Sequence, residues 1–170
     1  MKNIVDFYSG ISTDTEGRTI HDIFKFNYEQ LETIHDYIQW LFPLKEKSNF
    51  NDNAPLLTSG DIQVFRSDDV IKANVNKALR MMLDFYGFNM ATNDANIKIA
   101  KNENYEERAK NWITPFNHNY LRITRILKFL TLAGMKNYAA AFFGALENVY
   151  TGNKKTIGRT TFAYWKNACR

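Results

Sequence analysis

Apolar residues recur at helical spacing along most of the chain, and prolines or glycines separate the periodic segments. Residues 28–42 give the first clear case, since one side of a helix there would carry Leu31, Ile34, Ile38 and Leu41. Pro43 follows directly and cannot continue a helix. The pattern therefore predicts a first long helix over 28–42, followed by a long loop over 44–58 that is rich in Asn and Ser.

Further helices are predicted along the rest of the chain. Ser67 is a suitable N-cap for a helix that runs to Tyr86, where Gly87 provides a left-handed stop. Other helices are expected over 59–65, 103–113, 136–150 and 159–168. Residues 88–102 are ambiguous, because Ile97 to Ala100 fits a short strand as well as a turn of helix.

The most apolar segment covers residues 118–133, where apolar side chains occupy nearly the whole circumference of the predicted helix. A helix of this kind usually lies at the centre of its domain. No segment alternates convincingly enough to predict a full strand. We therefore expect an all-α fold, with residues 1–170 forming a single compact multi-helix domain around the helix at about 118–133.

Composition narrows the class of protein. The chain has 13 Phe, 9 Tyr and 3 Trp, which is typical of a chain that folds around a core. Its single cysteine, Cys169, cannot form an internal disulfide, and no cluster of ligands predicts a metal or another cofactor. Asp6 interrupts the apolar run at the N-terminus, so we expect no signal peptide. No apolar run predicts a transmembrane segment, so a cytoplasmic location is expected.

Charge is distributed unevenly. Residues 1–60 hold five Lys and Arg against nine Asp and Glu, a balance of −4, whereas residues 61–170 hold seventeen against nine, a balance of +8. Either the acidic part packs on the basic part, or the basic part faces an anionic partner. One version of the second alternative is a nucleic-acid-associated protein that uses the basic C-terminal half, namely Lys154, Lys155, Arg159, Lys166 and Arg170.

A first candidate site lies on the apolar helix. His118, Arg122 and Arg125 are spaced so that they share one helix face. A charge on such a helix is costly unless it is paired. Two interpretations are open: an internal ion pair with Asp36 or Glu32, or a site for a carboxylate or phosphate, to which Asn117 and Asn119 would add amide contacts.

A second candidate set lies on the predicted first helix and contains His35, Asp36, Gln39 and Trp40. One interpretation is helix packing, with Trp40 anchored through its indole N–H. The other is ligand binding, or catalysis by His35 or His118. Glycine-rich phosphate loops, HExxH and GxSxG motifs do not occur in the sequence, so enzyme chemistry is the weaker expectation.

Two segments resemble a known family. The stretch from His35 to Pro43, HDYIQWLFP, together with Ser48, Asn51 and the residues APLL at 54–57, is similar to the hallmark of the opioid growth factor receptor conserved N-terminal domain. The stretch FNHNYLRITRILKFLTLAGM, from Phe116 to Met135, is similar to a second block of the same family. The resemblance is strongest over 31–57 and 112–135.

The resemblance implies a non-enzymatic ligand-binding or interaction domain. Animal members are described as receptors for an enkephalin peptide that associate with the nuclear envelope, and short single-domain relatives occur in bacteria. The expected partner is accordingly an unknown peptide or anionic ligand, bound through the residues of the two candidate sets.

Overall fold

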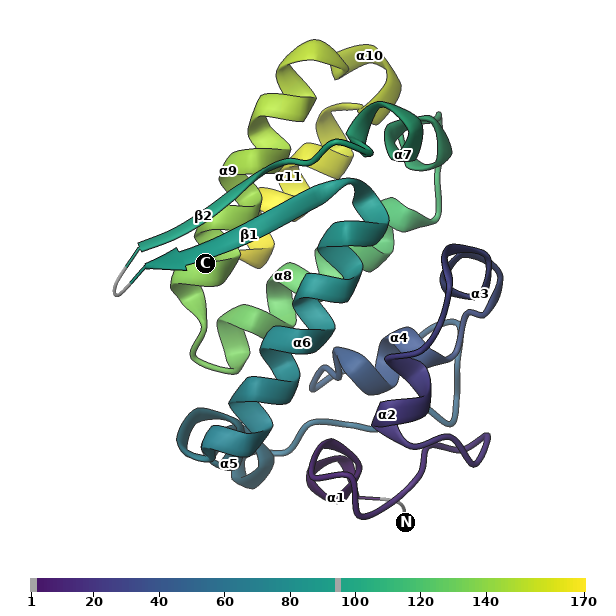
Figure 1. Ribbon diagram of the computed structural model, residues 1–170, viewed down its shortest axis with the longest axis vertical. Coiled ribbons are helices and arrows are strands. Elements are labelled where there is room, and N and C mark those ends of the chain that lie inside the picture. The colour runs from purple at the N-terminus through teal and green to yellow at the C-terminus, as the bar shows by residue number, and fades with distance from the viewer. Residues whose placement is uncertain (1–2, 94–95) are drawn as a thin grey trace. The chain divides into compact units, whose positions relative to one another are not determined.

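The computed structural model describes residues 3–93 and 96–170. It contains two compact units, residues 1–81 and 82–170, which are described separately below. The long helix α6 (Asp69–Tyr86) begins in the first unit and ends in the second (Figure 1). The sequence prediction that residues 1–170 form a single domain stays a prediction.

Short capped helices build the first unit. They are α1 (Ile4–Tyr8), α2 (Ile20–Ile23), α3 (Tyr28–Thr33), α4 (Tyr37–Leu41) and α5 (Ser59–Ser67). Thr19, Asn27 and Thr58 each form a capping box at the start of a helix, which satisfies backbone donors that a short helix would otherwise leave exposed. The N-cap of α6 is Asp68, one residue after the predicted Ser67, and its carboxylate accepts from the Ile71 amide at 2.9 Å.

The predicted continuous helix over 28–42 is wrong. Helix α3 ends at Thr33, and Ile34 is extended, with φ −85° and ψ 129°, before α4 begins at Tyr37. A side chain causes part of this break, because the Tyr37 hydroxyl donates to the Leu31 carbonyl at 2.8 Å. In an unbroken helix that carbonyl would accept from the amide four residues later.

An aromatic cluster fills the core of the first unit. Phe7 packs on Trp40 with ring centroids 5.1 Å apart, and Tyr8 packs edge-on against Phe65 at 4.9 Å. The Tyr8 hydroxyl donates to the Leu41 carbonyl, which ties α1 to the end of α4. The loop over 44–58 is confirmed as non-helical, and an isolated parallel bridge between Leu44 and Leu56 joins its two ends.

The second unit combines helices with a β-hairpin. Its helices are α7 (Tyr105–Trp112), α8 (Asn119–Leu132), α9 (Lys136–Gly152), α10 (Lys154–Ile157) and α11 (Arg159–Ala168). Strands β1 (Phe88–Asn93) and β2 (Asn96–Lys101) pair antiparallel, from Phe88 with Lys101 to Asn93 with Asn96. Figure 1 shows this ribbon alongside α9.

The hairpin overturns the all-α prediction, because the fold is helix-dominated but mixed α and β. It occupies the segment 88–102 that the sequence left ambiguous. Apolar and polar positions alternate cleanly only over residues 88–90 and 96–99, which is at or below the shortest run that indicates a strand. Packing decides the matter: Phe88 is buried and its ring lies 6.2 Å from that of Phe142 on α9.

Helix α8 is the apolar helix expected over 118–133, and it packs against α9 and α11. The indole of Trp165 on α11 donates to the Tyr120 carbonyl at 3.1 Å. Phe162 on the same helix stacks on Tyr150 of α9, with ring centroids 4.1 Å apart. Gly87 has φ 90° and closes α6 as predicted, which places β1 directly after the helix.

Candidate functional site

A pocket of 740 Å³ lies within the first unit. Three segments line it: the start of α1 with Asn3 and Ile4, helix α4 with Trp40, and the residues that lead into α5, including Asp52 to Leu56, Thr58 and Asp61. Thr15 adds a contact from the α1–α2 connection. Sites for small ligands commonly measure about 300–1,000 Å³, so the pocket is large enough to hold a ligand.

The pocket combines an apolar wall with acidic side chains. Ile4, Pro55 and Leu56 contribute apolar surface, and Leu56 is 43% exposed. Asp61 is engaged in the cap of α5, where its carboxylate accepts from the Thr58 amide at 2.8 Å and from the Thr58 hydroxyl at 2.6 Å. Asp52 is exposed on the 44–58 loop. Sequence reasoning missed these acids because nothing local marks a loop carboxylate as part of a pocket.

Trp40 is the predicted site residue that lines the pocket. It is buried, as a packing residue should be, but its indole Nε1 has no hydrogen-bond partner among the residues that the structure describes. The other two tryptophans are also buried, and both are satisfied: Trp112 donates to the Tyr86 carbonyl at 3.0 Å and Trp165 to the Tyr120 carbonyl. The expectation that Trp40 is anchored through its N–H is therefore wrong.

The other members of the second set lie at the break between α3 and α4. His35 is exposed in this link, so it does not share a helix face with Gln39 as the predicted helix required. Asp36 accepts from Arg18 at 2.7 Å, and Arg18 also pairs with the fully buried Asp14. Gln39 is buried, and its amide, in the orientation that satisfies both polar atoms, donates to the Asp36 and His35 carbonyls.

In the first candidate set, the two asparagines organise the turn before α8. The Asn117 amide nitrogen donates to the Asn111 carbonyl at 3.0 Å and to the Thr114 hydroxyl at 2.9 Å, while its oxygen accepts from the Asn119 amide at 2.9 Å. Asn119 is fully buried and accepts from the Tyr86 hydroxyl at 3.4 Å. Both side chains therefore make structural contacts, and their predicted role toward a ligand stays a prediction.

The cations of the same set differ in exposure. His118 occupies the N-cap position of α8 and is exposed, Arg122 is only 5% exposed, and Arg125 is half-buried. Phe116, two residues before the cap, is fully exposed and has a left-handed φ of 56°. A bulky residue in this conformation is an outlier. Because Phe116 is exposed, the turn before α8 presents an aromatic ring to solvent.

The described ranges 3–93 and 96–170 give little support to a metal site or a membrane span. No group of three histidine, cysteine, aspartate or glutamate side chains there could hold a metal ion. None of the described helices has the length and hydropathy to cross a bilayer. Burial raises the pKa of the Cys169 thiol to about 11, which disfavours its nucleophilic thiolate form.

Part of the pocket lining, namely Trp40 and residues 52–56, and the residues of α8 come from the two segments that carried the family resemblance. Comparison with family models supports that resemblance over the whole chain, since the opioid growth factor receptor (OGFr) conserved region matches residues 1–170. The chain belongs to the opioid growth factor receptor family. This agrees with the assignment made from the two sequence blocks.

Individual members of the opioid growth factor receptor family are similar at moderate identity. The rat opioid growth factor receptor is 36% identical over 143 residues, which cover 82% of this chain and 24% of the relative. The opioid growth factor receptor-like protein 1 of Xenopus tropicalis is 38% identical over 139 residues, covering 80% and 26%. The human opioid growth factor receptor is 40% identical over 114 residues, covering 67% and 16%.

The matched region is thus about a quarter or less of the length of these relatives. No solved structure matches the chain.

Proposed function

We propose that this chain is a non-enzymatic, receptor-like domain that binds a ligand and acts in signalling from the cytoplasm. Membership of the opioid growth factor receptor family supports the receptor-like role, because the relatives are named as receptors for a growth factor. The first ligand to consider is a peptide of the enkephalin class, which the family resemblance implies.

The observation that carries the proposal is the pocket of the first unit. Its volume of 740 Å³ lies in the range of sites that enclose small ligands. Its lining combines apolar side chains with a few polar groups, which is the usual composition of such sites. The pocket also draws on both parts of the hallmark segment, Trp40 from its helix and Ala54 to Leu56 from its loop.

Calorimetric titration with an enkephalin peptide tests the proposal. Thr15 is exposed and lines the pocket, so Thr15→Trp should fill the cavity from its rim and weaken binding at least about tenfold. Glu16→Trp is the matched control, since Glu16 is the exposed neighbour and is absent from the pocket lining. Equal affinity of the two variants for the peptide would mean that the peptide does not bind in the pocket.

A basic face of α8 is the second element of the proposal. His118, Arg122 and Arg125 would form a separate site in the second unit for an anionic group, because guanidinium groups match carboxylate and phosphate oxygens. Titration with inorganic phosphate should give saturable binding that Arg125→Gln weakens. Lys136→Gln, an exposed change of the same charge on α9, should leave it intact. Loss of binding in both variants would indicate a nonspecific charge effect.

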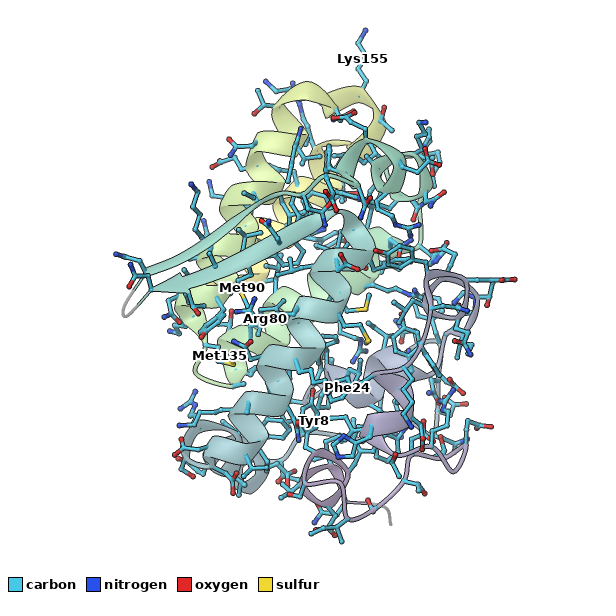
Figure 2. The ribbon with its side chains drawn as sticks, viewed as in Figure 1. Tyr8, Phe24, Arg80, Met90, Met135 and Lys155 are labelled. Carbon is cyan, nitrogen blue, oxygen red and sulfur yellow. The ribbon has the colours of Figure 1, made fainter. Side chains whose placement is uncertain are left out.

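A nucleic-acid role is the second candidate function, and the C-terminal helices favour it. Lys154, Lys155, Arg159, Lys166 and Arg170 are all exposed, and none forms an ion pair with a carboxylate of the described residues. Figure 2 shows the Lys155 side chain extending away from the ribbon. Residues 148–170 contain no acid. Binding of a labelled single-stranded oligonucleotide should weaken steeply with salt, and salt-independent binding would refute this version.

A further inference from the structure

Helix α11 is fastened along its inner side. The fully buried indole of Trp165 donates to the Tyr120 carbonyl at 3.1 Å, and the Thr131 hydroxyl donates to the Ala168 carbonyl at 2.9 Å. Both bonds join α11 to α8 within the second unit. The helix therefore presents its opposite side to solvent in a defined orientation relative to α8.

The exposed side of α11 has the composition of a surface that binds a polyanion. It carries two cations, a hydroxyl, an amide, one small apolar side chain and one large aromatic ring, and it carries no acid. These residues form the outer face of α11 and are Arg159, Thr160, Ala163, Tyr164, Lys166 and Asn167. The core of a protein–protein interface is depleted in charged residues, whereas a nucleic-acid site gathers Lys and Arg along one face of a helix. The outer face is therefore better suited to a nucleic acid than to a protein.

Further cations adjoin the outer face of α11. Lys154 and Lys155 of α10 are both exposed, and Gly158 alone separates α10 from α11. The Lys155 side chain extends away from the ribbon (Figure 2). The last acid of the sequence is Glu147 on α9, so α10 and α11 contain no acidic side chain. The two helices therefore carry only positive side-chain charge, which attracts phosphates.

Helical spacing separates the cations of the outer face from its aromatic ring by one row of polar side chains. Arg159 and Lys166 are nearly two turns apart, so they share one side of the helix, about 10 Å apart along its axis. Tyr164 lies further round the helix. Thr160 and Asn167, its i−4 and i+3 neighbours, lie between the ring and the two cations. A strand whose phosphates follow the cations can therefore place a base on the tyrosine ring.

Tyr164 is the feature that favours a single strand over a duplex. Its side chain is 57% exposed, and its ring pairs with no other ring of the residues that the structure describes. Any unpaired base can stack on such a ring, because every base has a π face. The bases of a duplex are already stacked on one another and lie out of reach. The ring can therefore add to binding only when the strand is single.

We propose that the outer face of α11 binds single-stranded nucleic acid, with one base stacked on Tyr164 and with phosphates beside Arg159 and Lys166. The inference rests on the nucleic-acid role proposed above, and it adds the form of the nucleic acid and the residue that contacts a base. Thr160 and Asn167 would donate to phosphate or sugar oxygens. Stacking on a tyrosine discriminates little among bases, so binding should tolerate any sequence.

Three fluorescently labelled probes test the stacking contact by anisotropy titration of the full chain. They are a twelve-nucleotide oligothymidylate, a sugar–phosphate strand of the same length without bases, and the oligothymidylate paired with oligoadenylate. The first two carry the same number of phosphates, so the difference between them measures the contribution of the bases. The oligothymidylate should bind about 5- to 100-fold more tightly than the strand without bases.

Substitutions of Tyr164 assign that difference to one ring. Tyr164→Leu keeps an apolar side chain but removes the π face, so the oligothymidylate should bind about as weakly as the strand without bases. Tyr164→Phe keeps the ring and should retain the preference. Both variants should bind the duplex as the parent chain does. Phe50→Leu is the matched control and should change nothing, because Phe50 is an 81% exposed ring in the first unit.

Charge substitutions test the phosphate contacts. Arg159→Gln and Lys166→Gln should weaken the oligothymidylate and the strand without bases by the same factor. Each should also lower the slope of log affinity against log salt by about 0.7, as expected for one lost phosphate contact of a single strand. Lys47→Gln makes the same charge change at an exposed residue of the first unit and should leave the slope unchanged. An equal loss in Lys47→Gln would mean that net charge alone governs binding, which overturns the inference.

The outcomes separate the inference from the function on which it rests. If the oligothymidylate binds no more tightly than the strand without bases, or if Tyr164→Leu binds it as tightly as Tyr164→Phe, the inference is overturned while a nucleic-acid role through charge stands. If none of the three probes binds, both fail. Binding to phosphatidylserine vesicles but to none of the nucleic-acid probes would assign the outer face to an anionic membrane surface instead.

Discussion

Gly87 connects α6 to β1, and replacing it with alanine should destabilise the second unit strongly. Its φ is +90°, its amide donates to the Asp84 carbonyl, and its carbonyl accepts from the Asn102 amide, both at 2.9 Å. An added Cβ would lie 2.7 Å from the Tyr105 Cα and 3.2 Å from the Arg108 Cβ. Real Cβ atoms do not approach backbone this closely, so α7 would have to shift.

Two costs add up in Gly87→Ala. A left-handed backbone costs a residue with a Cβ about 1–2 kcal/mol, and overpacking against fixed neighbours costs about 1–3 kcal/mol. The free energy of unfolding should therefore fall by about 2–5 kcal/mol. Because the clash involves the Tyr105 backbone rather than a flexible side-chain end, relaxation cannot remove it cheaply.

Two other glycines separate the costs. Gly17 has φ +80° with no atom within 4 Å of an added Cβ, so Gly17→Ala carries only the conformational cost of about 1–2 kcal/mol. Gly144 lies in α9 with the same open space, and alanine there should stabilise the helix by up to about 1 kcal/mol.

Urea unfolding followed by far-UV circular dichroism measures all three variants against the parent chain. Gly87→Ala should lose at least about 1 kcal/mol more than Gly17→Ala, the difference being the contribution of crowding. If the two variants lose the same free energy, the close approach of α7 to Gly87 does not constrain the fold, and the reasoning is refuted.

Three further predictions concern buried or half-buried groups. Trp112→Phe should lower the free energy of unfolding by about 1 kcal/mol more than Trp40→Phe, because both remove the same volume but only Trp112 loses a hydrogen bond. If urea unfolding shows that the two variants lose the same free energy, the Trp40 indole has an acceptor. Asp14→Asn should lower the free energy of unfolding by about 1–3 kcal/mol, because the fully buried carboxylate pairs with Arg18. An unchanged midpoint of urea denaturation would contradict this. Burial raises the pKa of Cys169 to about 11, so the thiolate is scarce at neutral pH and its fraction grows as pH rises toward that value. Alkylation of Cys169 by iodoacetamide at pH about 8 should therefore be about tenfold slower than alkylation of a free thiol. Unfolding in urea should make the alkylation faster, because it removes the burial.

Local signals in the sequence placed most of the helices. Gly87 as a stop for α6, the apolar segment that forms α8, and the helix that forms α9 were all predicted from spacing and from residues with special backbone preferences. Such signals act within a few residues, so they can be read without knowing the fold. The two blocks that resembled the family likewise sufficed to assign it, since a family pattern is itself a property of the sequence.

The tertiary structure decided what depends on distant contacts. The Tyr37 hydroxyl donates a hydrogen bond to the Leu31 carbonyl and so helps to divide the predicted first helix. Packing of Phe88 on Phe142 selects a strand where the sequence was ambiguous. The pocket brings Trp40 together with Asp52, which lies on a separate loop. The missing acceptor of the Trp40 indole could not be foreseen, because an unsatisfied donor is defined by every group around it, and only the folded chain specifies those groups.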